Sequence, residues 1–264
     1  MLKKNEVKAK LAVGEELFGI LNSVPSPLLC DMFAAAGYDF VILDTEHLLR
    51  SPVELEHCLR AAEAAAITAL VRVPLEDRAL MGRLLDAGAQ GIVIPRVSSV
   101  EQARQAIDAV RFRPLGRRGI TGGRPTGFGR LSIDEYMAQA NREVLLVLMI
   151  EDAEGARNLP QILAQPGIDM ILEGALDLSI AMGHGSDIRH AAVQSVLKDI
   201  AGDCAAAGVP FCAIPRFSGQ LEAWRRAGVS TFLTGEDRGI LYRHLRAHLE
   251  DFKSPAITIS HSHS

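Results

Sequence analysis

The segment DFVILDTEH, residues 39–47, places three ionisable side chains directly after a short apolar run. Residues 40–43 are apolar and typical of a strand that is buried on both faces. Asp44, Glu46 and His47 follow where such a strand would leave the core. Carboxylates and an imidazole at that point could bind a metal ion or move a proton. Ordinary loop residues facing water would give the same pattern.

The apolar runs that would position these side chains recur along the chain. Four segments share a helix-like stretch that ends at glycine and is followed by aliphatic residues: 35–46, 86–97, 165–176 and 226–237. Four further apolar runs alternate with them, at 17–22, 68–74, 144–151 and 209–215. Eight strands over about 250 residues predict a (β/α)₈ barrel. A doubly wound open sheet is the alternative, but no G-x-G-x-x-G follows the first strand.

Helical patterns fill the intervals between these runs. They are predicted at 27–36, 52–65, 76–87, 98–112, 153–164, 190–207, 218–227 and 237–252. No linker interrupts them, so residues 1–264 are predicted to form one domain, with a core at about 15–252 and a disordered tail at 253–264. The Gly/Arg-rich part of the long fourth connection, residues 116–130, is predicted to be an irregular loop at the catalytic rim.

The composition excludes several classes of protein. Of 264 residues, 48% are hydrophobic and 23% charged, and the net charge of −4 argues against a nucleic-acid-binding surface. The longest apolar run, Val144–Ile150, is too short to cross a bilayer. The four cysteines are scattered and predicted to be reduced core residues. With no apolar leader at the start, the sequence predicts a cytoplasmic protein.

Barrel enzymes carry their chemistry at the carboxyl ends of the strands. In this chain those positions hold Asp44, Glu46, His47, Arg72, Glu151, Asp152, Glu173, Asp177 and Arg216. The opposite strand ends carry little comparable charge apart from Asp39 and Asp169. This asymmetry predicts a site at the carboxyl ends.

Glu151 ends a continuous apolar run, so its carboxylate would emerge from the barrel interior and would need a cation or a proton there. Together with Asp177, from the next strand, it could hold a hard divalent ion such as Mg²⁺ or Mn²⁺. The alternative is a salt bridge between Glu151 and a nearby arginine.

Arg72 is a cation at the end of another buried strand. Its guanidinium could hold a carboxylate substrate through two parallel hydrogen bonds. It could equally do no more than neutralise Asp44 or Glu46. No lysine stands at the end of a core strand, which argues against Schiff-base chemistry.

The motifs DFVILDTEH, VRVP, LLDAGAQGIVIP, MIEDAEGARNL and GALDLSIAMG resemble, in order and spacing, the HpcH/HpaI family of metal-dependent aldolases. The resemblance covers roughly residues 15–252. It implies a (β/α)₈ barrel assembled as a trimer or hexamer, with active sites near subunit boundaries. It also implies metal binding by Glu151 and Asp177, and a 2-oxo acid such as pyruvate held by Arg72.

The resemblance further implies that His47 transfers protons, with Asp44 nearby and Asp86 as its orienting partner. The segment around Ala175, Leu176 and Asp177 would line the substrate. The implied reaction is a class II aldolase cleavage through the enolate of a 2-oxo acid, with an aldehyde as the second compound. It needs a divalent metal cation and no organic cofactor.

Several positions depart from the family pattern. Ala175 replaces a proline, Glu173 adds an acid, Met149 replaces a glutamine, and TGGRPTGFGR replaces a run of small residues. Arg124 in that loop could add a second cation for a substrate with several carboxylates. This favours a second interpretation, a siderophore-pathway citrate synthase that condenses oxaloacetate with acetyl-CoA. A barrel that binds an oxo acid without catalysis is the non-enzymatic alternative.

Overall fold

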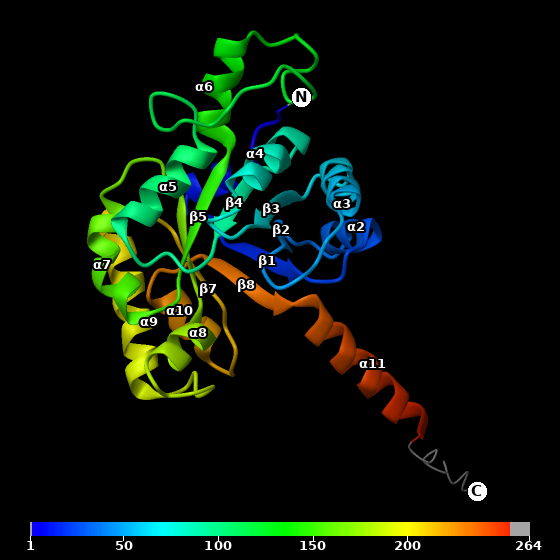
Figure 1. The fold of residues 1–264 in the computed structure, drawn as a ribbon. Coiled ribbons are helices and arrows are strands. Elements are labelled where there is room, and N and C mark those ends of the chain that lie inside the picture. The colour runs from blue at the N-terminus through cyan, green and yellow to red at the C-terminus, as the bar shows by residue number, and fades with distance from the viewer. Residues whose placement is uncertain (1, 254–264) are drawn as a thin grey trace, which may run out of the picture.

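The computed structural model describes residues 2–253, in which eight parallel strands close into a barrel (Figure 1). The strands pair in chain order, and β8 returns to β1. They are β1 (Leu17–Asn22), β2 (Phe40–Asp44), β3 (Thr68–Arg72), β4 (Gly91–Ile94), β5 (Leu145–Ile150), β6 (Met170–Glu173), β7 (Phe211–Ala213) and β8 (Thr231–Glu236). The predicted barrel is therefore confirmed, and the open-sheet alternative is wrong.

Eleven helices accompany the strands within the described residues. They are α1 (Glu6–Ala12), α2 (Pro27–Ala35), α3 (Pro52–Ala64), α4 (Arg78–Ala87), α5 (Val100–Val110), α6 (Ile133–Glu143), α7 (Ala153–Leu163), α8 (Ala175–Ala181), α9 (Ala191–Ala207), α10 (Gln220–Arg226) and α11 (Asp237–Lys253). Eight of them correspond to predicted helices, whereas α1, α6 and α8 were not predicted.

Local sequence determines where several of these helices begin. Ser51 and Glu54 form a capping box at the start of α3, and Ser132 and Glu135 form another at α6. Each pair satisfies backbone N–H groups that have no acceptor within the helix.

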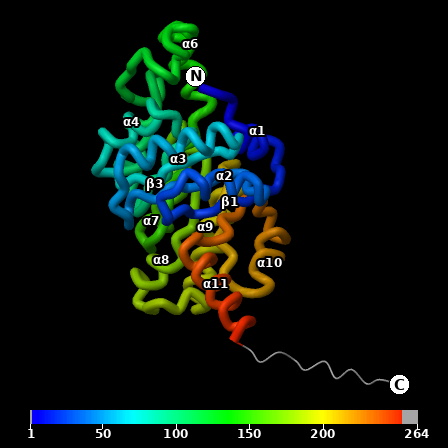
Figure 2. Tube along the Cα trace, turned by 90° about the vertical axis from the view of Figure 1, so that its right-hand side faces the viewer, coloured from blue at the N-terminus to red at the C-terminus, as the bar shows by residue number. Residues whose placement is uncertain are grey.

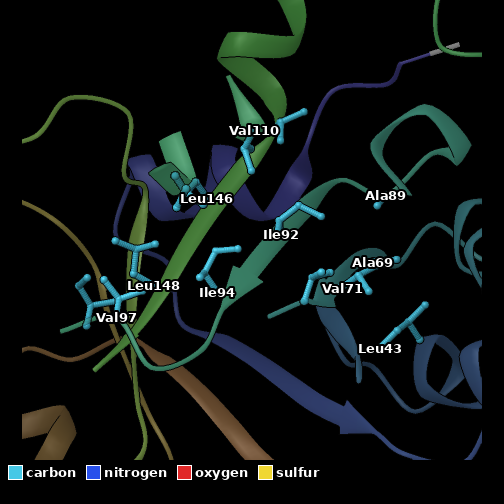
Figure 3. Packing of buried hydrophobic residues seen from close by; sticks show 14 of the residues in the cluster. Leu43, Ala69, Val71, Ala89, Ile92, Ile94, Val97, Val110, Leu146 and Leu148 are labelled. Carbon is cyan, nitrogen blue, oxygen red and sulfur yellow. The ribbon is translucent and has the colours of Figure 1, made fainter. Parts of the chain in front are cut away.

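Alternation along the strands separates two apolar layers. One set of side chains, including Phe40, Leu70, Val147 and Met149, fills the barrel interior. The other set packs between barrel and helices; Figure 3 labels Leu43, Val71, Ile92, Leu146 and Leu148 among its members. The four cysteines are buried and free, as predicted.

Helix α1 lies across the amino ends of the strands. Its Lys10 pairs with Asp39 beside β2 at 2.6 Å, and its Lys8 pairs with Asp169 beside β6 at 2.7 Å. Val7 of the same helix belongs to the interior apolar cluster. The two acids at the strand starts therefore hold a helix against the closed end of the barrel.

The Gly/Arg-rich loop lies at this same end, with α6 and the N-terminus and away from α8 (Figure 1). Arg118 pairs with Asp86 near the end of α4 at 2.7 Å. Arg124 pairs with Glu63 and donates to the carbonyl of Ala87, at the ends of α3 and α4. The prediction that residues 116–130 reach the catalytic rim is wrong within one chain, because this loop connects α5 to α6 and its arginines are held at the ends of α3 and α4.

The last helix, α11, extends away from the barrel (Figure 1 and Figure 2). From residue 254 on, the tail that was predicted to be disordered lies outside the described residues. None of the helices described between residues 2 and 253 is long and apolar enough to cross a membrane. The prediction of a single domain stays a prediction.

Candidate active site

Strand alternation brings charged residues to the open end of the barrel interior. Asp44 shares the inward face of β2 with Ile42, and Arg72 shares that of β3 with Leu70. Glu151 directly follows β5 and continues the inward alternation of Val147 and Met149. All three charged side chains are buried: their residues are 1%, 8% and 6% exposed. Buried charges require partners, and these partners define the site.

Arg72 links two of the acids. Its Nε lies 2.8 Å from Asp44 Oδ1, and its Nη1 lies 3.3 Å from Glu46 Oε2. Burial alone would raise the pKa of Asp44, but its bond with Arg72 holds that pKa below the ordinary value. Arg72 therefore neutralises these acids, and whether it also binds a substrate carboxylate stays a prediction. Its Nη2 forms no hydrogen bond with any of the described residues.

Glu151 has no arginine or lysine partner within the described part of the chain, so the salt-bridge alternative for it is wrong. Its Oε2 accepts a hydrogen bond from the backbone N–H of Arg96 at 2.8 Å. The pKa of Glu151 is raised to about 7, mainly by burial and also by the neighbouring charges of Asp177 and Glu46, against the lowering effects of Arg96 and Arg72. The carboxylate is short of positive charge.

Gly174 forms the wall beside this carboxylate. A Cβ atom on Gly174 would lie 2.4 Å from both Cγ and Oε1 of Glu151, so only glycine fits here without a shift. Asp177 follows in the first turn of α8, which begins after Gly174, and its side chain is exposed. The short connection from β6 to α8 thus brings the second carboxylate close enough to affect the pKa of Glu151.

These two carboxylates fit a hard divalent cation. Oxygen donors with neighbouring negative charge suit Mg²⁺ or Mn²⁺, which keep water or substrate oxygens in their remaining positions. Among residues 2–253, no group of three or more histidine, cysteine, aspartate or glutamate side chains could hold a metal ion. A cation at Glu151 and Asp177 would therefore need further ligands from water or substrate.

His47 stands at the rim, with a side chain that is 53% exposed and an Nε2 that lies 3.6 Å from Glu46 Oε2. Asp86 does not contact it within one chain, because Asp86 lies near the amino-end face and pairs with Arg118. Arg124 is also held at the amino-end face. Within a single chain, the prediction that Arg124 supplies a second cation over the pocket is therefore wrong. Only a second copy of the chain could bring either residue to this pocket.

Three other strand-end residues have structural partners. Glu173 shares the outward face of β6 with Ile171 and pairs with Arg216 at 2.9 Å, so it does not join the inward acids. Burial raises the pKa of Glu173, against the effect of Arg216. Asp152 caps α7 by accepting a hydrogen bond from the N–H of Gly155.

Arg96 is the site residue that the sequence analysis missed. Its backbone binds Glu151, and its Nε lies 3.2 Å from Glu46 Oε1. Its φ of 56° is left-handed, which is unusual for a residue with a side chain and concentrates at functional sites. Arg96 follows β4 by two residues, so the strand-end criterion applied to every strand would have found it.

The family described as HpcH/HpaI aldolase/citrate lyase matches residues 19–233. A 2-keto-3-deoxy-L-rhamnonate aldolase of Salmonella gallinarum (strain 287/91 / NCTC 13346) is 33% identical over 96% of this chain and 95% of its own. Among solved structures, the citrate synthase SbnG is 38% identical, with a TM-score of 0.87 over 94% of this chain and 97% of its own. An HpcH/HpaI aldolase from Desulfitobacterium hafniense DCB-2 is 29% identical, with a TM-score of 0.88 over 94% and 97%.

Proposed function

The chain belongs to the HpcH/HpaI aldolase/citrate lyase family and is a carbon–carbon lyase of the pyruvate aldolase type. We propose that it cleaves a 4-hydroxy-2-oxo acid to pyruvate and an aldehyde. The observation that carries this proposal is the pair of neighbouring carboxylates, Glu151 and Asp177, beside the guanidinium of Arg72. This arrangement supports metal-assisted chemistry on a carboxylate substrate. The rhamnonate aldolase relative also acts on a 2-keto acid, as its name states.

Glu151 and Asp177 would hold the divalent cation, Mg²⁺ or Mn²⁺. When bound, it supplies Lewis-acid stabilisation of the negative charge that develops on the oxo acid as the carbon–carbon bond breaks. The raised pKa of Glu151 supports this assignment, because a cation would favour the ionised carboxylate that burial disfavours.

Arg72 would bind the substrate carboxylate through Nη2 while Nε and Nη1 stay with Asp44 and Glu46. The two acids thus fix the plane of the guanidinium, which gives directed donors. The first-turn N–H groups at Ala175, Leu176 and Asp177 have no intrahelical acceptors and would line the substrate.

His47 would accept the proton of the substrate hydroxyl as the bond to the aldehyde carbon breaks. Its exposed position at the rim leaves it accessible to substrate, and an ordinary imidazole titrates near neutral pH.

The first experiment measures aldol cleavage and pyruvate–aldehyde condensation before and after removal of metal by chelator. Glu151→Gln should abolish both activity and its metal dependence, whereas Glu154→Gln, at an exposed site on α7, serves as the matched control. Full turnover by the Glu151→Gln protein would refute the ligand assignment.

A citrate synthase that condenses oxaloacetate with acetyl-CoA is the second candidate. It is supported by the likeness to the citrate synthase SbnG. A substrate with additional carboxylates needs a further cation, and within one chain Arg96 would supply the cation that had been predicted at Arg124. Its side chain is exposed beside Glu46.

Two substrate pairs discriminate between the candidates. Turnover of pyruvate with an aldehyde selects the aldolase, and turnover of oxaloacetate with acetyl-CoA selects the synthase. If neither pair is turned over but calorimetry still detects oxo acid binding, the result would support a non-catalytic barrel instead.

We also propose that the working enzyme is a homo-oligomer, a trimer or hexamer. The projecting helix α11 carries large apolar side chains that its own barrel leaves exposed: Leu241, Tyr242, Leu245, Leu249 and Phe252. An exposed apolar stripe of this kind marks an interaction surface. Light scattering should find an oligomer, and charged substitutions along the stripe should dissociate it.

A further inference from the structure

A cavity of about 580 Å³ lies outside the barrel, between α9 and α10. None of the residues assigned above to metal, oxo acid or proton transfer lines it. Its walls come from α9, α10, the loop before α9 and residues 217–219 after β7. Cavities of this size hold ligands well beyond a single inorganic ion.

Two cations stand at this cavity without acidic partners. Arg189 and Lys198 line it, and the lining contains no aspartate or glutamate. Within the described residues, neither cation forms an ion pair. The guanidinium of Arg189 lies over the ring of Phe217, 5.0 Å from its centroid. This contact orients the guanidinium and leaves the N–H groups at its edge available to an anion.

Trp224 contributes an aromatic side chain to the same wall. The residue is only 4% exposed, so its indole is held rigidly beside the cavity. The cavity therefore combines two cations with the aromatic side chains of Phe217 and Trp224.

A chain of contacts connects this wall to the barrel mouth. Gln194 Oε1 and Gln220 Nε2, both from cavity residues, are 3.4 Å apart, and Gln220 Oε1 accepts a hydrogen bond from the N–H of Arg216 at 2.7 Å. Arg216 in turn pairs with Glu173, directly before Gly174. A ligand in the cavity would thus contact elements that support the candidate active site.

We propose that this cavity binds the phosphorylated part of a nucleotide. The phosphate groups would contact Arg189 and Lys198, and the remainder would fill the aromatic and apolar space beside Phe217 and Trp224. The nucleotide is either a free nucleoside diphosphate or the nucleotide portion of a coenzyme A thioester. The assignment does not depend on the reaction proposed above, because it concerns binding alone.

Intrinsic fluorescence tests this directly, because Trp224 is the only tryptophan in the sequence. The protein is titrated with ADP, with coenzyme A and with inorganic phosphate, while tryptophan emission is recorded. A saturable change with ADP or coenzyme A, and a much weaker response to phosphate, is expected. Saturation by ADP alone identifies a free nucleotide, whereas tighter binding of coenzyme A identifies the thioester.

The double variant Arg189→Ala/Lys198→Ala should bind these ligands roughly tenfold or more weakly, because hydrogen bonds to charged groups are lost. Arg130→Ala, which removes an exposed cation elsewhere, is the matched control and should bind as the unmodified protein does. No saturable change with either nucleotide, or equal affinity in the double variant, would overturn the proposal. Phosphate binding as tightly as ADP would overturn it too, by reducing the cavity to a simple anion site.

Discussion

Gly174→Ala tests whether the position of Glu151 controls metal binding. The new Cβ would lie 2.4 Å from Cγ and Oε1 of Glu151, whereas carbon atoms in contact stay about 3.5 Å apart. The Glu151 side chain must therefore move by about 1 Å. Misplacement by about 1 Å in an active site can cost about a hundredfold in rate, so kcat/KM should fall by about that factor.

The fold should survive this substitution. Gly174 has a φ of −131°, which alanine adopts without strain, and the three atoms nearest to the new Cβ all belong to the Glu151 side chain. Replacing glycine at a helix N-cap should lower the free energy of unfolding by no more than about 1 kcal/mol. The defect should therefore appear in metal affinity and turnover, with little change in stability.

The assay compares steady-state kinetics, Mn²⁺ affinity by calorimetry and urea denaturation. Gly202→Ala in α9 is the matched control, because nothing lies within 4 Å of its new Cβ. Its activity should be unchanged and its stability should rise by up to about 1 kcal/mol. A folded Gly174→Ala protein with normal metal affinity and turnover would refute the reasoning.

Three further perturbations test the remaining charges. Arg72→Ala should raise KM for the oxo acid and lower the free energy of unfolding by about 3 kcal/mol, because Asp44 would stay buried without its partner; an unchanged KM would count against the substrate contact. Asp44→Asn should lower the free energy of unfolding near pH 7, and this difference from the unmodified protein should shrink below about pH 4. The reason is that the ionised Asp44, with its lowered pKa, stabilises the fold only above that range. Urea denaturation at several pH values measures the difference, and a difference that stays the same at low pH would contradict the prediction. Dialysis against chelator should remove turnover and added Mg²⁺ or Mn²⁺ should restore it, and undiminished turnover in metal-free protein would exclude the metal role.

The sequence predicted the barrel well, because each strand carries its own signal. Runs buried on both faces and glycines at helix ends are local features, and their order alone leads to a (β/α)₈ closure. Helix α8 was missed because its seven residues are too few to show a helical period. Helix α1 was missed because its role, covering the amino ends of the strands, depends on distant partners such as Asp169.

Site residues were predictable where two local rules coincide. Asp44, Arg72 and Glu151 stand at carboxyl strand ends and also share the inward alternation of their strands. Glu173 satisfies the first rule and fails the second, because it shares the outward face of β6 with Ile171. Alternation along β6 therefore separates it from the candidate site on sequence grounds alone.

The misplaced residues show where such local rules stop. Arg124 and Asp86 follow no strand, so neither rule constrains them, and long-range pairs at the ends of α3 and α4 hold them at the amino-end face. Arg96 is the opposite case, a residue that was not predicted and yet lies at the site. Its left-handed backbone turns its N–H toward Glu151, and no side-chain pattern encodes that turn. Its cost of about 1–3 kcal/mol must be offset by contacts formed only in the closed barrel, among them the bonds to Glu151 and Glu46.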